Sequence, residues 1–584
     1  MNFLNPIFTE KAECQDCYKC LRECAVKAIK VEGGRAAVVS DLCVLCGHCV
    51  EVCPVGAKRV RSDLPRVRRL LETKDRVIVS LAPSFAAEFP GLEPERLVAA
   101  LRRLGFAAVS ETARGADLVA RRVARELAAA AGAQTGDPAG DGSPNGRLLI
   151  SSACPTVVEH IKKYRFRFAA GVTSLYSPLL AHAQELKRVF GADAAVVFIG
   201  PCISKKRESD LHRDLVDVAI DFRDLAEWLD AEGIRPALLR PTEEDRFVPG
   251  RAGKGALYPV DGGMIAAIKR YGPPASARFM AFSGIGEIDR ALEELSEAEL
   301  TEPVFLELLA CPGGCVNGPR GRSRSGTVAK RLAILSYAET APDRSEAREP
   351  ALDHPWNLAP VRAEEPPAER IAEALRRTGK YGREDELNCG GCGYDTCRDF
   401  ARAMIAGKAE AGMCVSYMRK LAQKKANGLI KYIPSGVVIV DKDLKIVECN
   451  RNFVRLLGEE AEQLWEAKPG LEGADLEKLV PFHRYFRDIL NGAEAVDRDI
   501  RAGGRILHAA VFAVERGAFA GGVFQDVTDP WVRKDRVVSQ ARKVITKNLA
   551  VVQKIAFLLG ENAAESESIL NSIIDSFDNP GAEK

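Results

Sequence analysis

The chain has 584 residues and a mass of 63.4 kDa, which at about 100–200 residues per domain predicts about three to five domains. Its 83 Lys and Arg side chains nearly cancel 81 Asp and Glu, so it lacks the overall basic charge that drives non-specific nucleic-acid binding. Apolar residues make up 46% and charged residues 28%, and no run approaches the ~18 consecutive apolar residues of a membrane helix. We therefore expect neither nucleic acid nor a membrane as a partner.

The unusual number is the count of 17 cysteines. They are clustered, and the opening MNFLNPIFTEKAECQDC shows neither an apolar signal segment nor a cleavage site. We therefore expect a cytoplasmic protein with reduced thiols. Clustered reduced thiols indicate metal binding, catalysis or redox chemistry.

Residues 1–62 contain an internal repeat, two copies of C-x2-C-x2-C-x3-C. In this spacing three thiolates bind one [4Fe-4S] cluster and the fourth crosses to the other. The prediction is one cluster on Cys14, Cys17, Cys20 and Cys53, and a second on Cys43, Cys46, Cys49 and Cys24. Two zinc sites are the alternative, but zinc usually uses separated C-x2-C pairs. The segment resembles bacterial two-cluster ferredoxins, which implies electron transfer.

After a charged connector, residues 76–337 alternate buried β-type runs with helical patterns, which predicts an α/β domain. The expected strands are VIVSLAP, AAVSET, RLLISSACP and AAVVFIGPC. Two of them run directly into a cysteine, at the strand end where open α/β sheets usually build sites. The four cysteines of this region, taken together, predict a further cluster site: Cys154, Cys202, Cys311 and Cys315.

Several segments in this order resemble the catalytic domain of [FeFe]-hydrogenases: APSF, ETARGADL, SSACPT, GPCISKKRE, YPVDGGMIAAIKR and ELLACPGGCVNG. The resemblance implies that the same four cysteines bind a [4Fe-4S] cubane and that Cys315 bridges to a di-iron subcluster carrying carbonyl and cyanide. It also implies that Lys205 holds a cyanide ligand and that Glu208 sits on the proton route.

The departures from the family pattern are equally informative. The cysteine that normally delivers a proton is Ala153, which can act as neither acid nor base. Such a group is typically worth about 10²–10⁴ in rate, so we expect slow hydrogen turnover. The expected Trp is Val157, the expected Met is Gly200, and Pro319 interrupts the Gly-rich run after the last ligand. These changes resemble the sensory group of [FeFe]-hydrogenases.

Residues 338–370 are rich in Pro, Glu and Arg, and we interpret them as a linker. Residues 371–428 hold a further ligand set, Cys389, Cys392, Cys397 and Cys414, the last expected at the far end of the helix DFARAMIAGKAEA. Four thiolates there can hold a cubane, with zinc as the alternative. The segment resembles the small four-cysteine 4Fe-4S domain of corrinoid proteins and hydrogenase-like sensors.

Residues 429–530 contain no ligand cluster and resemble a PAS domain, with a hairpin around Asp441, a helix entered at Asn450 and closing strands at ILHAAVFAVE and FAGGVFQDVTD. Cys449 and His483 are interpreted as structural residues. Residues 531–584 show apolar residues every seven positions, which favours a helical tail with a coiled-coil seam and hence a homodimer. A helix packed on its own PAS domain is the alternative.

The predicted fold class is multidomain α/β: a ferredoxin-like two-cluster module, an α/β hydrogenase-type domain, a small helical 4Fe-4S domain, an α+β PAS domain and a helical tail. Neither a dinucleotide fingerprint nor a P-loop is present. Electrons must then pass to or from a protein such as ferredoxin, and any signal must reach a separate effector by contact. We predict a hydrogen or redox sensor with four cubanes. The alternatives are a ferredoxin-dependent hydrogenase of low activity and an electron-transfer scaffold that lacks the di-iron subcluster.

Overall fold

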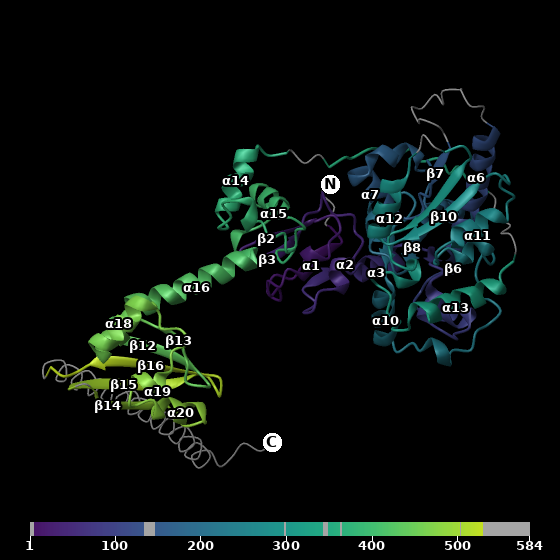
Figure 1. Ribbon diagram of the computed structural model, residues 1–584. Helices are drawn as coiled ribbons and strands as arrows, with labels where there is room; N and C mark the ends of the chain where they lie inside the picture. The colour runs from purple at the N-terminus through teal and green to yellow at the C-terminus, as the bar shows by residue number, and fades with distance from the viewer. Residues whose placement is uncertain are drawn as a thin grey trace, which may run out of the picture. The chain divides into compact units, whose positions relative to one another are not determined.

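The computed structural model describes residues 5–132, 147–296, 300–342, 349–361, 365–502 and 504–529. The chain divides into two compact units, Met1–Tyr417 and Met418–Lys584 (Figure 1). The helical tail predicted at 531–584 lies outside the described residues.

The ferredoxin module at the start of the first unit consists of two antiparallel strand pairs and two one-turn helices. Its elements are β1 (Ile7–Thr9), α1 (Lys19–Arg22), β2 (Ile29–Glu32), β3 (Arg35–Val38), α2 (His48–Glu51) and β4 (Lys58–Val60). β1 pairs with β4 and β2 pairs with β3, so the predicted hairpin between the two cysteine runs is confirmed. The cysteine loops lie between these short elements.

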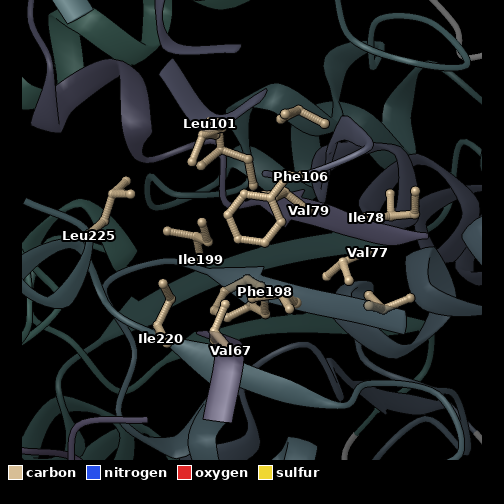
Figure 2. Close-up of a cluster of buried hydrophobic side chains, with 14 of the residues drawn as sticks. Val67, Val77, Ile78, Val79, Leu101, Phe106, Phe198, Ile199, Ile220 and Leu225 are labelled. Carbon is tan, nitrogen blue, oxygen red and sulfur yellow. The ribbon is translucent and has the colours of Figure 1, made fainter. Parts of the chain in front are cut away.

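The larger sheet of the hydrogenase-type domain is parallel, in the order β6-β5-β8-β9. Its strands are β5 (Val77–Leu81), β6 (Ala108–Glu111), β8 (Ala195–Ile199) and β9 (Val218–Ile220). Every residue of β5 and β8 is buried, because helices cover both faces of a parallel sheet. Figure 2 shows this core, in which Phe198 and Ile199 of β8 lie among side chains such as Phe106 and Leu101.

A second parallel sheet, in the order β10-β11-β7, completes the domain. Its strands are β7 (Leu148–Ile150), β10 (Arg278–Ser283) and β11 (Val304–Leu309). The four strands predicted for this domain correspond to β5, β6, β7 and β8.

The helices of this domain are α3 (Leu64–Thr73), α4 (Phe85–Glu88), α5 (Pro94–Arg103), α6 (Ala113–Gly132), α7 (Pro155–Tyr164), α8 (Pro178–Phe190), α9 (Ser204–Leu211), α10 (Phe222–Ala231), α11 (Gly263–Lys269), α12 (Ile285–Glu294) and α13 (Thr327–Glu339). The segment interpreted as a charged connector is therefore helix α3. The charged residues of this segment form salt bridges within the protein: Arg61 and Arg66 both bind the buried carboxylates of Asp63 and Asp210.

Part of the segment predicted as a linker packs back on the hydrogenase-type domain. Leu352 is fully buried, the Tyr176 amide donates to the Leu352 carbonyl, and the Trp356 indole donates to the Thr173 carbonyl. His354 stacks on Tyr176 with ring centroids 4.7 Å apart. This stretch therefore forms a strap across the domain.

The small cysteine domain comprises α14 (Ala368–Arg376), α15 (Cys397–Ile405) and the start of α16 (Val415–Tyr432). The predicted helix over DFARAMIAGKAEA is too long. α15 ends at Ile405, where the Lys408 amide bonds back to the Ala403 carbonyl in a C-terminal capping turn. A 3-10 turn at Ala411–Met413 then brings the chain to Cys414.

The second unit contains one antiparallel five-stranded sheet in the order β13-β12-β16-β15-β14. Its elements are β12 (Gly436–Asp441), β13 (Ile446–Cys449), α17 (Arg451–Leu457), α18 (Glu459–Ala467), α19 (Leu476–Leu479), α20 (Arg484–Leu490), β14 (Val496–Ala502), β15 (Arg505–Glu515) and β16 (Phe519–Asp526). The predicted hairpin, the helix after Asn450 and the two closing strands are all present. Phe453, Phe486 and Phe524 are fully buried in the core.

Candidate functional site

The four cysteines of the hydrogenase-type domain come together around one hollow. Cys154 and Cys202 follow β7 and β8, whereas Cys311 and Cys315 follow β11. All four line a cavity with an empty volume of about 360 Å³. β7 and β11 belong to one parallel sheet and β8 to the other, so loops at the carboxyl ends of strands from both sheets meet at this hollow. The arrangement matches the predicted cubane site, in which four thiolates surround a cluster.

A second cavity of about 490 Å³ adjoins the first and shares Cys154, Cys202 and Cys315 with it. Its walls are mostly apolar, with Phe198 and Leu179 among them. The second cavity therefore extends the cysteine hollow past three of its four thiols. Cys315, the predicted bridging residue, lines both cavities, as do Cys154 and Cys202.

Besides the three thiols, four polar side chains line the second cavity: Ser84, Thr112, Lys205 and Tyr258. Lys205 Nζ donates to Ser177 Oγ at 2.9 Å and lies 2.6 Å from Glu208 Oε2. Among the described residues the buried Ser84 hydroxyl has no hydrogen-bond partner. A buried hydroxyl without a partner is costly, so the cavity offers a donor to a bound acceptor.

Ala153 precedes Cys154, which belongs to the wall of this cavity, and only 2% of the Ala153 surface is exposed. Its amide donates to Ser151 Oγ at 3.2 Å, and its carbonyl accepts from the Tyr258 hydroxyl at 3.2 Å. The position is therefore held tightly but carries no ionisable group. Burial raises the pKa of Tyr258 well above its usual value, so the phenol remains a proton donor.

The space beside Gly200 is occupied by neighbouring side chains. A Cβ at this position would lie 2.5 Å from Phe198 Cζ and 2.7 Å from Ala82 Cβ. Phe198 and Ala82 both line the second cavity. The Phe198 ring thus fills the volume in which the family pattern expects a methionine.

The thiols of this site are strongly desolvated. Burial raises the pKa of Cys202 to about 11, and burial together with the neighbouring thiols raises the pKa values of Cys311 and Cys315 well above the usual range. Buried thiols become thiolates when a metal centre supplies the compensating positive charge. The donor set is therefore suited to a bound iron–sulfur cluster.

The ferredoxin-module cysteines fall into the two predicted sets. Burial raises the pKa of Cys20, and the neighbouring thiols that raise it further are those of Cys17, Cys14 and Cys53. Burial is also the largest cause of the raised pKa of Cys49, and the neighbouring thiols that raise it further are those of Cys46, Cys43 and Cys24. Each last cysteine of a run thus lies with the other run, as the crossed pairing requires.

The module docks against the hydrogenase-type domain through its second set. Cys46 lines the same hollow as Cys311 and contributes to the raised pKa of Cys311, after burial and the nearer thiols. The Lys163 ammonium donates to the Cys43 carbonyl at 3.0 Å, and the Tyr164 hydroxyl donates to the Leu42 carbonyl at 2.6 Å. One ferredoxin-type set therefore adjoins the cubane site.

The C-terminal cysteines also line one hollow, of about 320 Å³: Cys389, Cys392, Cys397 and Cys414. Lys380, Tyr394 and Ser416 share its wall. Burial raises the pKa of Cys414, but hydrogen bonds from Ser416 and Lys380 outweigh burial and lower it overall. This thiol is thereby favoured as a thiolate.

This domain packs on the ferredoxin module rather than standing apart. The Val31 amide donates to the Lys408 carbonyl at 2.9 Å, and the Gly33 amide donates to Glu410 Oε1 at 2.7 Å. Tyr394 packs in one cluster with Cys24 and Cys392, and burial together with the thiols of Cys392 and Cys24 raises its pKa to about 12. The three cysteine-bearing parts of the first unit are therefore contiguous.

In the described residues no group of three His, Cys, Asp or Glu side chains is arranged to hold a single metal ion. No helix in that part of the chain is long and apolar enough to cross a membrane. In the second unit Cys449 Sγ donates to the Gly470 carbonyl and His483 Nδ1 contacts the Val480 carbonyl, so both act locally in the fold.

Sequence reasoning missed three residues of these sites: Ser84, Tyr258 and Lys380. Ser84 and Tyr258 lie inside segments that carry the family resemblance, APSF and YPVDGGM, which is the signal that could have found them. Lys380 lies nine residues before Cys389, and its side chain reaches the hollow only because α14 folds back onto α15.

Together these features define an iron–sulfur protein with a hydrogenase-type domain. Comparison with known families agrees: residues 75–273 and 272–319 match the iron only hydrogenase large subunit, C-terminal domain, and residues 36–59 match a 4Fe-4S binding domain. Residues 385–416 match a putative Fe-S cluster family, and residues 427–497 match a PAS domain. The chain thus carries the C-terminal domain of iron-only hydrogenase large subunits, joined to 4Fe-4S domains and a PAS domain.

Two relatives illustrate the likeness. The NADP-reducing hydrogenase subunit HndD of Solidesulfovibrio fructosivorans is 28% identical over 52% of this chain and 60% of its own length. Iron hydrogenase 1 of Clostridium pasteurianum is 25% identical over 45% of this chain and 53% of its own length. The chain thus spans little more than half the length of these relatives. A solved [FeFe]-hydrogenase variant from Chlamydomonas reinhardtii aligns at 20% identity and a TM-score of 0.37, covering 48% of this chain and 91% of that chain.

Proposed function

We propose that this protein is a hydrogen or redox sensor, in which a hydrogenase-type site exchanges electrons with iron–sulfur clusters and the PAS domain passes the resulting state to a partner protein. The observation that carries the proposal is Ala153. A buried methyl group precedes Cys154 of the cavity wall, at the position where the family pattern expects a proton-transferring thiol. The cysteine sets for electron transfer are retained, so the site has lost a means of fast proton transfer and kept its electron connections.

The residues available to hold the cofactors follow from the two adjoining cavities. The four cysteines of the first cavity would hold a cubane, and Cys315 would anchor a di-iron subcluster in the second. When bound, that subcluster supplies a metal site at which hydrogen exchanges with two protons and two electrons. The Ser84 hydroxyl and the Lys205 ammonium would donate hydrogen bonds to its polar ligands, and the apolar walls would exclude water.

Two of these side chains would also handle protons. Lys205 lies between the cavity and Glu208, so the pair is placed to carry a proton away from the cavity. The Tyr258 hydroxyl is a second fixed donor, held on the Ala153 carbonyl. Proton transfer along either route replaces a direct thiol, and slower exchange is the expected consequence.

Electrons would leave through the contiguous cysteine sets. The set with Cys46 adjoins the hydrogenase-type hollow, and Tyr394 packs in one cluster with Cys24 and with Cys392 and Cys414 of the C-terminal set. A ferredoxin or similar carrier would exchange electrons with the outer clusters. The PAS domain and the helical tail would contact the effector, and pairing of the tail would give a homodimer.

The first experiment is infrared spectroscopy of the anaerobically matured protein, combined with hydrogen-evolution assays. Carbonyl and cyanide bands together with weak hydrogen evolution are expected. Turnover comparable to that of ordinary [FeFe]-hydrogenases would refute the sensor. Absence of the bands from fully matured protein would leave the electron-transfer scaffold as the function.

The matched variants are Ala153→Cys and the control Ala267→Cys, which adds a thiol to the same apolar cluster. On the sensor proposal Ala153→Cys gains less than about tenfold, because Val157 and the Phe198 ring have also changed the surroundings. A gain of about 10²–10⁴ with unchanged iron content and infrared bands would favour the second candidate, a ferredoxin-dependent hydrogenase of low activity. The retained Lys205 and Glu208 pair is the observation that favours this candidate.

A further inference from the structure

The C-terminal cysteine hollow contains a buried lysine that touches a predicted ligand. Lys380 is 4% exposed, and its Nζ donates to Cys414 Sγ at 3.1 Å. Its remaining bonds go to the carbonyl and hydroxyl of Thr378, at 3.3 and 3.4 Å. The backbone is fixed as well, because the Lys380 amide bonds to the Leu375 carbonyl at the end of α14.

Within the described part of the chain, no carboxylate lies within salt-bridge distance of the Lys380 ammonium; its hydrogen bonds go to neutral groups and a cysteine sulfur. A buried charge without a partner costs several kcal/mol. The hollow beside it is lined by four thiols, and a [4Fe-4S] cluster held by four thiolates carries net negative charge. The position of Lys380 thus matches a bound anionic cluster.

Two of the three lysines near the other cysteine sets have a carboxylate partner, and the third bonds to neutral groups. Lys205 lies 2.6 Å from Glu208, and Lys163 lies 3.4 Å from Glu159, so each positive charge is offset by a carboxylate. Lys58 donates to Thr9 Oγ1 and to the Ala36 carbonyl. Lys380 differs from these three lysines in donating its hydrogen bond directly to a cysteine sulfur.

We propose that the Lys380 ammonium raises the reduction potential of the C-terminal cluster above that of the hydrogenase-domain cubane, so that electrons collect at this cluster. Reduction adds one negative charge to a cluster, and a nearby uncompensated cation stabilises the added charge. A hydrogen bond to a ligand sulfur acts in the same direction. Lys380 is a positioning residue here, because it acts on the cluster through Cys414.

The electron step balances without further reactants. One electron leaves a reduced cluster of the ferredoxin module, and the C-terminal cluster gains it. Tyr394 packs in one cluster with Cys24 of the donor and Cys392 of the acceptor. The accepting cluster would then be reduced next to the start of α16, which begins at Val415 and leads along the chain towards the PAS domain. Only the source of electrons rests on the proposed function.

The test measures reduction potentials in the full-length protein with reconstituted clusters. The protein is poised with dithionite and redox mediators, and each cluster is followed by electron paramagnetic resonance. A Cys389→Ser variant assigns the C-terminal signal. As the potential of the unmodified protein is lowered, this cluster is expected to be reduced before the hydrogenase-domain cubane. The opposite order of reduction in the unmodified protein would by itself overturn the proposal.

Lys380→Met removes the charge and keeps the length of the side chain, and Lys380→Arg restores the charge. At a fixed ambient potential Lys380→Met is expected to lower the ratio of reduced to oxidised C-terminal cluster at least tenfold, which is about 59 mV for a one-electron couple. Lys380→Arg should stay within about threefold of the unmodified protein. The control Arg377→Met removes an exposed charge three residues away and should change nothing.

An unchanged ratio in Lys380→Met with full iron content would overturn the proposal. If Lys380→Met fails to bind its cluster, Ser416→Ala provides the second measurement, because Ser416 Oγ lies 3.3 Å from the same sulfur. Its effect should have the same sign and be smaller, since the lost donor is neutral, and an effect of opposite sign would refute the reasoning. Because the reductant is dithionite, these results stand whether or not the protein responds to hydrogen. Repeating the poise with hydrogen gas tests the proposed function separately.

Discussion

Substitution of Gly47 by alanine is expected to loosen the ferredoxin module from the hydrogenase-type domain. Gly47 lies between Cys46 and α2 with φ at +82°, a conformation that disfavours side chains. A Cβ there would lie 2.5 Å from Pro319 Cγ and 2.7 Å from Ile203 Cδ1. Both contacts belong to the wall of the cubane hollow, so the strain falls where the two cysteine sets adjoin.

The magnitude has two parts. The left-handed backbone costs a non-glycine residue about 1–2 kcal/mol. Forcing a methyl group against a packed proline and isoleucine costs about 1–3 kcal/mol. The combined destabilisation is therefore about 2–5 kcal/mol. Gly56 isolates the first part, because its φ is +68° and no other atom lies within 4 Å of the position that a Cβ would take.

The assay is urea denaturation of the two variants and the unmodified protein under anaerobic conditions, with matched iron content. Gly56→Ala should cost about 1–2 kcal/mol, and Gly47→Ala should cost about 1–3 kcal/mol more. The magnetic coupling between the adjoining clusters should weaken only in Gly47→Ala. Equal free energies of unfolding for the two variants would refute the argued contact with Pro319.

Two further predictions concern buried polar residues. The His182 ring contacts Ser80 Oγ at 2.8 Å and Ser110 Oγ at 2.9 Å, and burial lowers its pKa to about 3. In the unfolded chain His182 binds a proton near pH 6.5, so its contribution to stability is complete above that pH and is lost as the pH falls. At pH 5 the loss is about 2 kcal/mol. The free energy of unfolding should therefore fall more steeply between pH 7 and 5 for the unmodified protein than for His182→Gln. Asn450→Ala removes the acceptor for the Val437 amide and the donor to the Ser435 carbonyl, and should destabilise the fold by about 2–4 kcal/mol. The loss should appear as faster hydrogen exchange of the β12 amides, and unchanged exchange would contradict the prediction.

The cysteine sets of the ferredoxin module and of the C-terminal domain could be predicted from the sequence because their cysteines lie in short loops with characteristic spacing. The strand pattern of the hydrogenase-type domain was equally accessible, since β5 and β8 are continuous apolar runs buried on both faces. These features depend on residues that are close along the chain.

Features that depend on distant residues could not be predicted. The sequence of α3 indicates only a charged connector, because the partner of its arginines, Asp210, lies about 145 residues further along the chain. The role of Lys380 depends on α14 packing against α15, and a lysine in a polar stretch is ordinarily expected on the surface.

The presence of Ala153 beside retained cysteine sets affects the two candidate functions differently, because one function depends on a reaction rate and the other on an equilibrium. Loss of an acid or base slows proton transfer by about 10²–10⁴ but leaves the equilibrium between hydrogen and reduced clusters unchanged. An enzyme depends on the rate, whereas a sensor depends on the equilibrium populations of its states. On the proposal for Lys380, the C-terminal cluster would shift that population towards the reduced form, at the segment that leads to the PAS domain. The substitution at residue 153 therefore harms a catalyst far more than a sensor, and the potential of the C-terminal cluster, rather than the turnover rate, is the quantity on which signalling would depend.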